Sequence, residues 1–98
     1  MSFAEIAAEH RRLSILRLLA EAPENAANDS ILHAGLGELG LHCSRDQARA
    51  DIAWLNEQGL LVAESIGSGL TVVTLTQRGR STAPCLAGPR PERADPGR

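Results

Sequence analysis

Apolar residues recur at helical spacing near the beginning of the chain. No glycine or proline interrupts residues 2–21, and intervals of seven, three and four separate successive apolar positions. Such intervals place side chains on one face of an amphipathic helix. Pro23 ends this pattern, and the polar run 24–28 is expected to form a loop. The apolar face consists of Ile6, Leu13, Leu16 and Ala20, and it is widened by Ile15 and Leu19.

A second, shorter helix is expected between this loop and Gly40. Asn28, Asp29 or Ser30 could cap its first turn, because each offers a side-chain oxygen to an unpaired backbone amide. Gly40 is suited to end the helix in the left-handed region of backbone conformation. The apolar face of this helix consists of Leu32, Leu36 and Leu39.

A third helix is expected to begin at about Arg45. Ser44 and Gln47 are three residues apart and form the sequence pattern of a capping box. Gly59 follows the last apolar position and is suited to end the helix. Two short helices joined by a tight, glycine-containing turn are typical of a helix-turn-helix. The apolar face of the third helix consists of Ala48, Ile52 and Leu55.

The remaining chain divides into a hairpin and a tail. Leu60 to Ile66 and Leu70 to Leu75 are rich in β-branched and aliphatic residues and flank a glycine-containing turn, which predicts a β-hairpin. Four of the five prolines lie in the charged segment 80–98, which is expected to be disordered. The prediction is therefore a mainly α domain with a small β-hairpin over residues 1–79, followed by a disordered tail over 80–98.

The order of these elements resembles the prokaryotic winged helix-turn-helix superfamily. Residues 12–19 are similar to its first helix, residues 52–61 to the end of its third helix, and residues 75–79 to the segment after its hairpin, or wing. Residues 27–32, together with residues 44–47 and Trp54-Leu55, more narrowly resemble a family of small winged-helix proteins from Mu-like prophages of proteobacteria. The resemblance implies a phage or prophage DNA-binding regulator.

The first turns of the third helix carry the candidate DNA-binding residues, Ser44, Arg45, Gln47 and Arg49, because a helix-turn-helix presents this part to the bases. Arg45 and Arg49 could reach guanine or phosphate, and Gln47 could pair with adenine. Ser44 could hold a phosphate at the positive end of the helix. Alternatively, Asp46 and Arg49 could form an ordinary surface pair three residues apart. The expected partner is double-stranded DNA, bound by a homodimer because one helix reads few base pairs.

The charge balance keeps a second interpretation open. The formal net charge is −2, and the hairpin turn 67–69 carries no arginine, so any DNA contact must be local. All ten basic residues are arginine, which suits bidentate recognition but also fits a GC-rich genome. The alternative function is a protein-interaction module that binds a phage or host protein during phage assembly or regulation.

Other side chains are interpreted structurally. Trp54, beside the apolar Leu55, is expected to cover the edge of the core. The arginines of the first helix, Arg11, Arg12 and Arg17, are expected to mark its solvated face.

The sequence offers little chemistry beyond binding. Cys43 and Cys85 are far apart and indicate no disulfide framework, which fits a cytoplasmic location. The adjacent His42 and Cys43 lack the spacing of a metal site, and no catalytic or phosphate-loop motif occurs. Neither a signal peptide nor a membrane span is expected. We therefore expect no enzyme activity, no cofactor and no bound metal.

Overall fold

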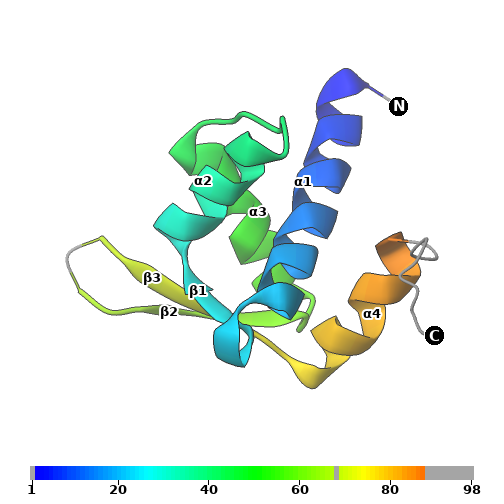
Figure 1. The fold of residues 1–98 in the computed structure, drawn as a ribbon. Coiled ribbons are helices and arrows are strands. Elements are labelled where there is room, and N and C mark those ends of the chain that lie inside the picture. The colour runs from blue at the N-terminus through cyan, green and yellow to red at the C-terminus, as the bar shows by residue number, and fades with distance from the viewer. Residues whose placement is uncertain (1, 68, 88–98) are drawn as a thin grey trace.

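The computed structural model describes residues 2–67 and 69–87 of the 98-residue chain. Three helices pack against one another beside a small antiparallel sheet whose hairpin extends to one side, and a fourth helix lies next to the first (Figure 1). The fold is mainly helical and has the arrangement of a winged helix, as predicted. The elements are α1 (Phe3–Glu21), η1 (Pro23–Asn25), β1 (Ala26–Asn28), α2 (Asp29–Glu38), α3 (Arg45–Glu57), β2 (Leu61–Ser65), β3 (Thr71–Leu75) and α4 (Gln77–Ala87).

The starts of α2 and α3 lie where their capping residues indicate. Asn28 caps α2 by accepting a hydrogen bond of 2.8 Å from the backbone amide of Ile31, which selects it from the three residues considered. Ser44 and Gln47 complete the capping box at the start of α3. Gly40 and Gly59 adopt φ angles of 80° and 77° after α2 and α3, so both helices end at glycines in the left-handed region.

A short strand occupies part of the segment that was expected to be a loop. Ala26–Asn28 forms β1, which pairs with β3 and gives a three-stranded sheet in the order β1-β3-β2. Glu24 and Asn25 have φ angles near 57°, and they reverse the chain between α1 and this strand. The Asn25 side chain also donates to the Leu19 carbonyl over 3.1 Å. The polar run 24–28 therefore follows the end of α1 and contributes a strand to the sheet. The pairing of this strand with β3 is a long-range interaction that local sequence patterns do not encode.

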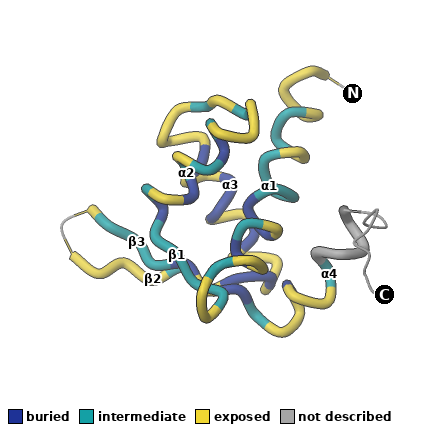
Figure 2. Tube along the Cα trace, in the orientation of Figure 1, coloured by how far each residue is buried: buried dark blue, intermediate teal, exposed yellow. Residues whose placement is uncertain are grey.

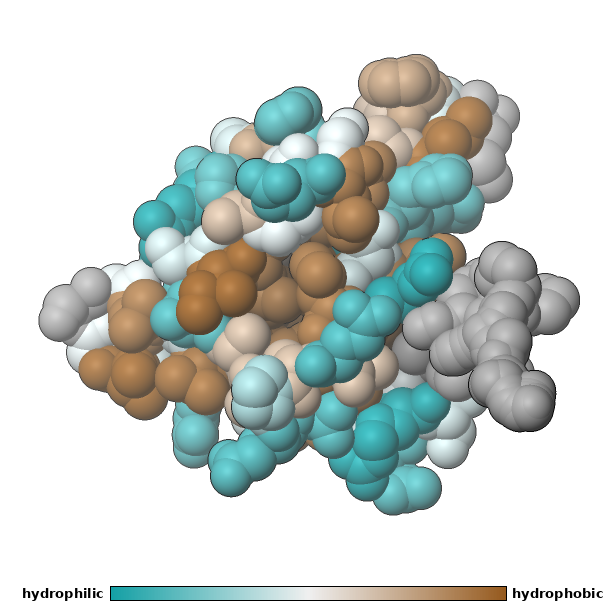
Figure 3. Space-filling model, in the orientation of Figure 1, coloured by the Kyte–Doolittle hydropathy of each residue, from teal (hydrophilic) through white to brown (hydrophobic). Residues whose placement is uncertain are grey.

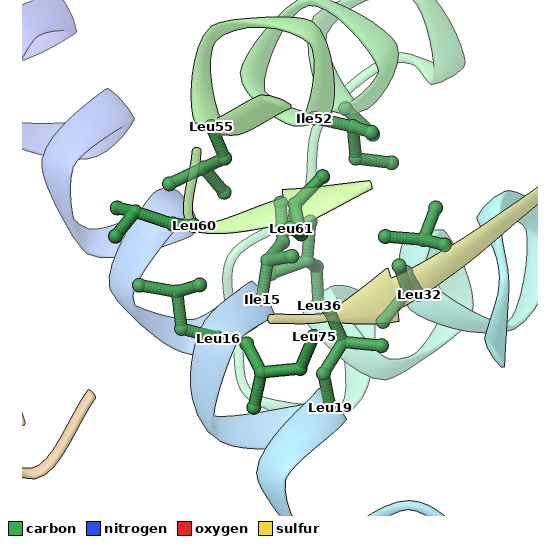
Figure 4. Close-up of a cluster of buried hydrophobic side chains, with 12 residues drawn as sticks. Ile15, Leu16, Leu19, Leu32, Leu36, Ile52, Leu55, Leu60, Leu61 and Leu75 are labelled. Carbon is green, nitrogen blue, oxygen red and sulfur yellow. The ribbon is translucent and has the colours of Figure 1, made fainter. Parts of the chain in front are cut away.

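The core lies where the three helices meet the inner face of the sheet. Buried positions are concentrated on the facing sides of these elements (Figure 2), and the close-up shows the side chains from helices and strands gathered together (Figure 4). The expected apolar faces of α2 and α3 supply five of these residues, whereas Ile6 of α1 and Leu39 after α2 are exposed. The core consists of Ile15, Leu16, Leu19, Leu32, Leu36, Ala48, Ile52, Leu55, Leu60, Leu61, Val73 and Leu75.

The hairpin is followed by a helix rather than by disordered chain. Thr76 donates from its hydroxyl to the Gly59 carbonyl over 2.8 Å and accepts from the Gly79 amide over 3.0 Å. A Cβ at Gly79 would lie 2.0 Å from the Leu60 carbonyl oxygen, so only glycine permits this approach. These contacts hold the start of α4, which extends to Ala87. α4 thus covers residues 80–87 of the segment that was expected to form the tail, and residues 88–98 lie outside the described chain.

Across residues 2–67 and 69–87, no helix is both long enough and apolar enough to cross a lipid bilayer.

Candidate nucleic-acid interface

The first turn of α3 is organised by its capping box. The Ser44 backbone amide donates to the Gln47 side-chain carbonyl over 3.1 Å, and the Gln47 amide donates to the Ser44 hydroxyl oxygen over 3.0 Å. Both residues are exposed at the surface. The Gln47 side-chain carbonyl already accepts one hydrogen bond, so pairing with adenine through both its oxygen and its nitrogen would use the second lone pair of that oxygen or open the cap.

Asp29 connects α3 to the rest of the domain. Asp29 is only 1 % exposed to solvent. The carboxylate accepts a 3.0 Å hydrogen bond from Arg49 Nε and a 3.3 Å hydrogen bond from the Thr71 amide, and Arg45 Nη2 lies 3.8 Å away. Burial alone would raise the pKa of Asp29, but the hydrogen bonds from Arg49 and Thr71 and the two positive charges outweigh burial and lower it. The carboxylate is therefore held ionised between two arginines.

Arg49 also ties the hairpin to α3. While its Nε contacts Asp29, its Nη2 donates to the backbone carbonyl of Gly69, which lies in the hairpin turn. One side chain thus joins three parts of the fold: α2, α3 and the wing. Its ion pair is with Asp29, twenty residues away, and this differs from the surface pair with Asp46 that the local spacing left open.

The two arginines remain accessible despite these contacts. The side chains of Arg45 and Arg49 are 46 % and 45 % exposed. A guanidinium group has five N–H donors, so the donors that Asp29 and Gly69 do not occupy can serve another acceptor. The two arginines face the single negative charge of Asp29, which leaves an excess of positive charge at this surface. The exposed Asp46 on the same turn reduces that excess. The structure brings Ser44, Arg45, Gln47 and Arg49 together at the start of α3, as their spacing predicts.

A shallow hollow separates α3 from the hairpin. It has a volume of about 270 Å³, and its walls include Arg49, Ala53 and Asn56 of α3, together with Ser65 and Gly69 of the hairpin. The hollow therefore continues from Arg49 along α3 toward the wing. Sequence reasoning identified the arginines but missed the role of Asp29, which it considered only as a helix cap. No local spacing relates Asp29 to Arg49.

A second arginine cluster lies inside the domain. Asp51 of α3 is 3 % exposed, and it pairs with Arg11 and, at 3.5 Å, with Arg12 of α1. The guanidinium carbon of Arg12 lies 4.3 Å from the centre of the Trp54 ring. Trp54 is 40 % exposed, so its ring lies at the surface against Arg12, and its expected role as a cover for the edge of the core stays a prediction. The expectation that Arg11 and Arg12 mark a solvated face is wrong, because their side chains are only 13 % and 29 % exposed, whereas Arg17 is exposed.

His33 and the Cys43 backbone serve local structure in the described chain. His33 Nε2 lies 2.7 Å from the Cys43 backbone carbonyl, which joins α2 to the turn before α3. Burial raises the pKa of the Cys43 thiol. Among residues 2–67 and 69–87, no three His, Cys, Asp or Glu side chains are close enough together to hold a metal ion.

Comparison with known proteins relates this chain to uncharacterized proteins of a phage and of a bacterium. It is 47 % identical over 79 residues to the uncharacterized protein gp26 of Escherichia phage Mu, with 81 % of this chain and 80 % of gp26 covered. It is 44 % identical over 92 residues to an uncharacterized protein of Haemophilus influenzae, with 92 % and 89 % covered. The chain belongs to the family of these two proteins, which supports the expected link to Mu-like phages. No family model and no solved structure matches it.

Proposed function

We propose that this protein is a DNA-binding regulator of a Mu-like phage or prophage, and that it acts without a cofactor in the cytoplasm. One observation carries the proposal: Arg45 and Arg49 project from the first turns of α3, half exposed, and are oriented by a single buried carboxylate. Side chains held in place before binding lose less conformational entropy when they meet a ligand. Arginine is also the residue that most often pairs with guanine in the major groove.

In the proposed complex, the beginning of α3 enters the major groove of double-stranded DNA. Arg45 contacts a guanine edge or a phosphate, because within residues 2–67 and 69–87 its polar contact is limited to the 3.8 Å ion pair with Asp29. Arg49 uses its remaining donors on the same strand while it holds the wing through Gly69. Ser44 and the first amides of α3 lie at the positive end of the helix dipole, where a phosphate is favoured. A homodimer would present two such helices to adjacent half-sites.

A second function is favoured by the charge distribution. The net charge of −2 and the lack of arginine in the hairpin turn 67–69 reduce non-specific attraction to phosphates. Under this alternative, the same exposed surface of α3 and the wing binds an acidic face of a phage or host protein. The fold is compatible with either function. Whether the partner is DNA or a protein therefore depends on what the surface around Arg45 and Arg49 binds.

Selection from a library of random duplexes tests the proposal directly. The full chain should enrich one short sequence motif over successive rounds, and Arg45→Ala should abolish the preference for guanine at one or more of its positions. Arg17→Ala is the matched control, because Arg17 is exposed on α1. Enrichment of no motif by the folded wild-type protein would exclude sequence-specific recognition and favour the protein-interaction module.

A further inference from the structure

The outer face of α3 carries a carboxylate in its first turn. The buried residues of α3 occupy one side of the helix, and at about 100° per residue the opposite side is centred on Asp46, Ala50 and Ala53. All three residues are exposed. Arg45 and Arg49, one turn apart, lie on the flank of this row, and Arg49 lines the hollow beside the hairpin. Asp46 therefore points away from the domain, with an arginine on either side of it in the sequence of the first turns.

The Asp46 carboxylate has no polar partner in the described part of the chain. Over residues 2–67 and 69–87 it accepts no hydrogen bond and forms no ion pair. Arg49, three residues further along the helix, pairs with Asp29 instead, and Arg45 also faces Asp29. Both oxygens of Asp46 are therefore available to a ligand.

The hairpin offers little hydrogen-bonding chemistry for telling bases apart. Figure 3 shows hydrophobic side chains over much of the hairpin, where Val62 and Ile66 are 51 % and 56 % exposed. Glu64 is the only charged residue of segment 61–75. Because base edges are distinguished mainly by their donors and acceptors, discrimination between bases depends on the exposed side chains of α3.

We infer that Asp46 reads a cytosine in the major groove, in a base pair next to the one that Arg45 contacts. This inference rests on the proposed function and names a base preference of the same site. In the major groove cytosine presents a donor, its N4 amino group. Guanine presents two acceptors, thymine presents an acceptor and a methyl group, and adenine places the acceptor N7 beside its amino group. A carboxylate offers acceptors alone, so cytosine is the base that it favours.

The charge of Asp46 favours a base over the DNA backbone as its contact. Phosphates repel a carboxylate, so Asp46 lowers non-specific affinity unless its oxygens meet a donor. The floor of the major groove supplies such donors, and the beginning of the recognition helix is the part that reaches them. Ala50 and Ala53, further along the same row, have short side chains that allow α3 to approach the bases closely. The donors of Arg45 and the acceptors of Asp46 are thus complementary to a guanine and a cytosine in neighbouring pairs.

Selection from a library of random duplexes, with the full chain, provides the first measurement. The wild-type motif should contain a cytosine within about two positions of the base that Arg45→Ala no longer selects. Asp46→Ala should accept all four bases at the cytosine position and retain the other preferences of the motif. Asp46→Asn should prefer adenine at that position, because an amide pairs with adenine N6 and N7.

Affinity for two defined duplexes provides the second measurement. One duplex carries the selected motif, and in the other the C·G pair assigned to Asp46 is replaced by T·A. The wild-type protein should bind the second duplex about tenfold more weakly, whereas Asp46→Ala should bind both equally. Glu38→Ala is the matched control: it removes the same charge from an exposed position on α2 and should keep the tenfold ratio. Far-ultraviolet circular dichroism checks that every variant retains its helices.

The two proposals fail in different ways. An acidic residue in the first turn also interacts favourably with the helix dipole, and that role alone predicts the same motif in wild type and Asp46→Ala. An unchanged motif would therefore overturn the assignment of Asp46 and leave DNA binding through α3 intact. Enrichment of no motif by the folded wild-type protein would overturn the proposed sequence-specific recognition itself, and the reading of cytosine with it.

Discussion

Arg49 donates from Nε to a carboxylate oxygen of Asp29 over 3.0 Å, and this contact connects the beginning of α3 to the beginning of α2. Because Asp29 also accepts from the Thr71 amide, a single buried carboxylate relates both helices to β3. Arg49 adds a link to the Gly69 carbonyl in the hairpin turn. The orientation of α3 and the position of the wing are therefore set by the same few polar contacts.

Replacing Asp29 tests how much these contacts stabilise the domain. Asp29→Asn retains an acceptor for the Thr71 amide but removes the charge that pairs with the two arginines. Hydrogen bonds to charged groups contribute about 1.5–3 kcal/mol each, and the arginines are half exposed, so the expected loss of unfolding free energy is about 1–2 kcal/mol. Urea denaturation provides the measurement. Asp46→Asn, an exposed change on α3, is the control and should have little effect.

The acid sensitivity of the protein should depend on Asp29. Its pKa is lowered in the folded chain by Arg49, Thr71 and Arg45 despite burial, relative to about 3.9 for an unfolded aspartate. The stabilisation is therefore complete above the unfolded value and is lost as pH falls toward the lower folded value. The stability difference between wild type and Asp29→Asn should stay constant from about pH 5 to 7 and shrink below about pH 4. A difference that grows on acidification would contradict this assignment.

The wing should loosen when Arg49 is removed. Arg49→Ala deletes the donor to the Gly69 carbonyl and the partner of Asp29. We expect faster hydrogen exchange at the amides of Ile66, Leu70 and Thr71, which lie at or next to the hairpin turn, with little change in the core of α1. Arg45→Ala is the control, since Arg45 makes no contact with the turn in the described chain. Equal exchange in wild type and Arg49→Ala would show that the wing is held by other contacts.

The close approach of α4 to the hairpin predicts a strict requirement for glycine. A Cβ at residue 79 would lie 2.0 Å from the Leu60 carbonyl oxygen, which is backbone and cannot rotate away. Gly79→Ala should therefore lower the unfolding free energy by about 1–3 kcal/mol, as overpacking commonly does. Arg80→Ala, one residue further along the same helix, should change it by less than about 0.5 kcal/mol. Thermal denaturation of both variants followed by circular dichroism makes the comparison.

The sequence predicts those parts of the fold that depend on neighbouring residues. The pair Ser44 and Gln47 defines the start of α3, and Gly59 defines its end, because capping is a local interaction. By contrast, β1 exists because Ala26–Asn28 pairs with a strand more than forty residues later, and three residues without β-branched side chains carry no local signal of a strand. The start of α4 likewise depends on contacts of Thr76 and Gly79 with the Gly59–Leu60 backbone.

The candidate site shows the same division. Helical periodicity was sufficient to place Arg45 and Arg49 together at the beginning of α3. Their shared partner, Asp29, could not be predicted, because its relation to Arg49 exists only after α2 and α3 have packed together. The internal pairing of Arg11 and Arg12 with Asp51 was missed for the same reason: a charge pattern on one helix does not reveal the carboxylate on the helix that it contacts.

A salt titration of binding to a mixed-sequence duplex of about 30 base pairs tests the central claim most directly. The logarithm of the wild-type binding constant should fall linearly with the logarithm of salt concentration, and Arg45→Ala should reduce the slope by about one if Arg45 contacts a phosphate. Arg17→Ala should leave the slope unchanged. A wild-type protein that is folded but shows no salt-dependent binding at low ionic strength, or a slope that is equal in wild type and in the Arg45→Ala, Arg49→Ala double variant, would contradict DNA binding through α3.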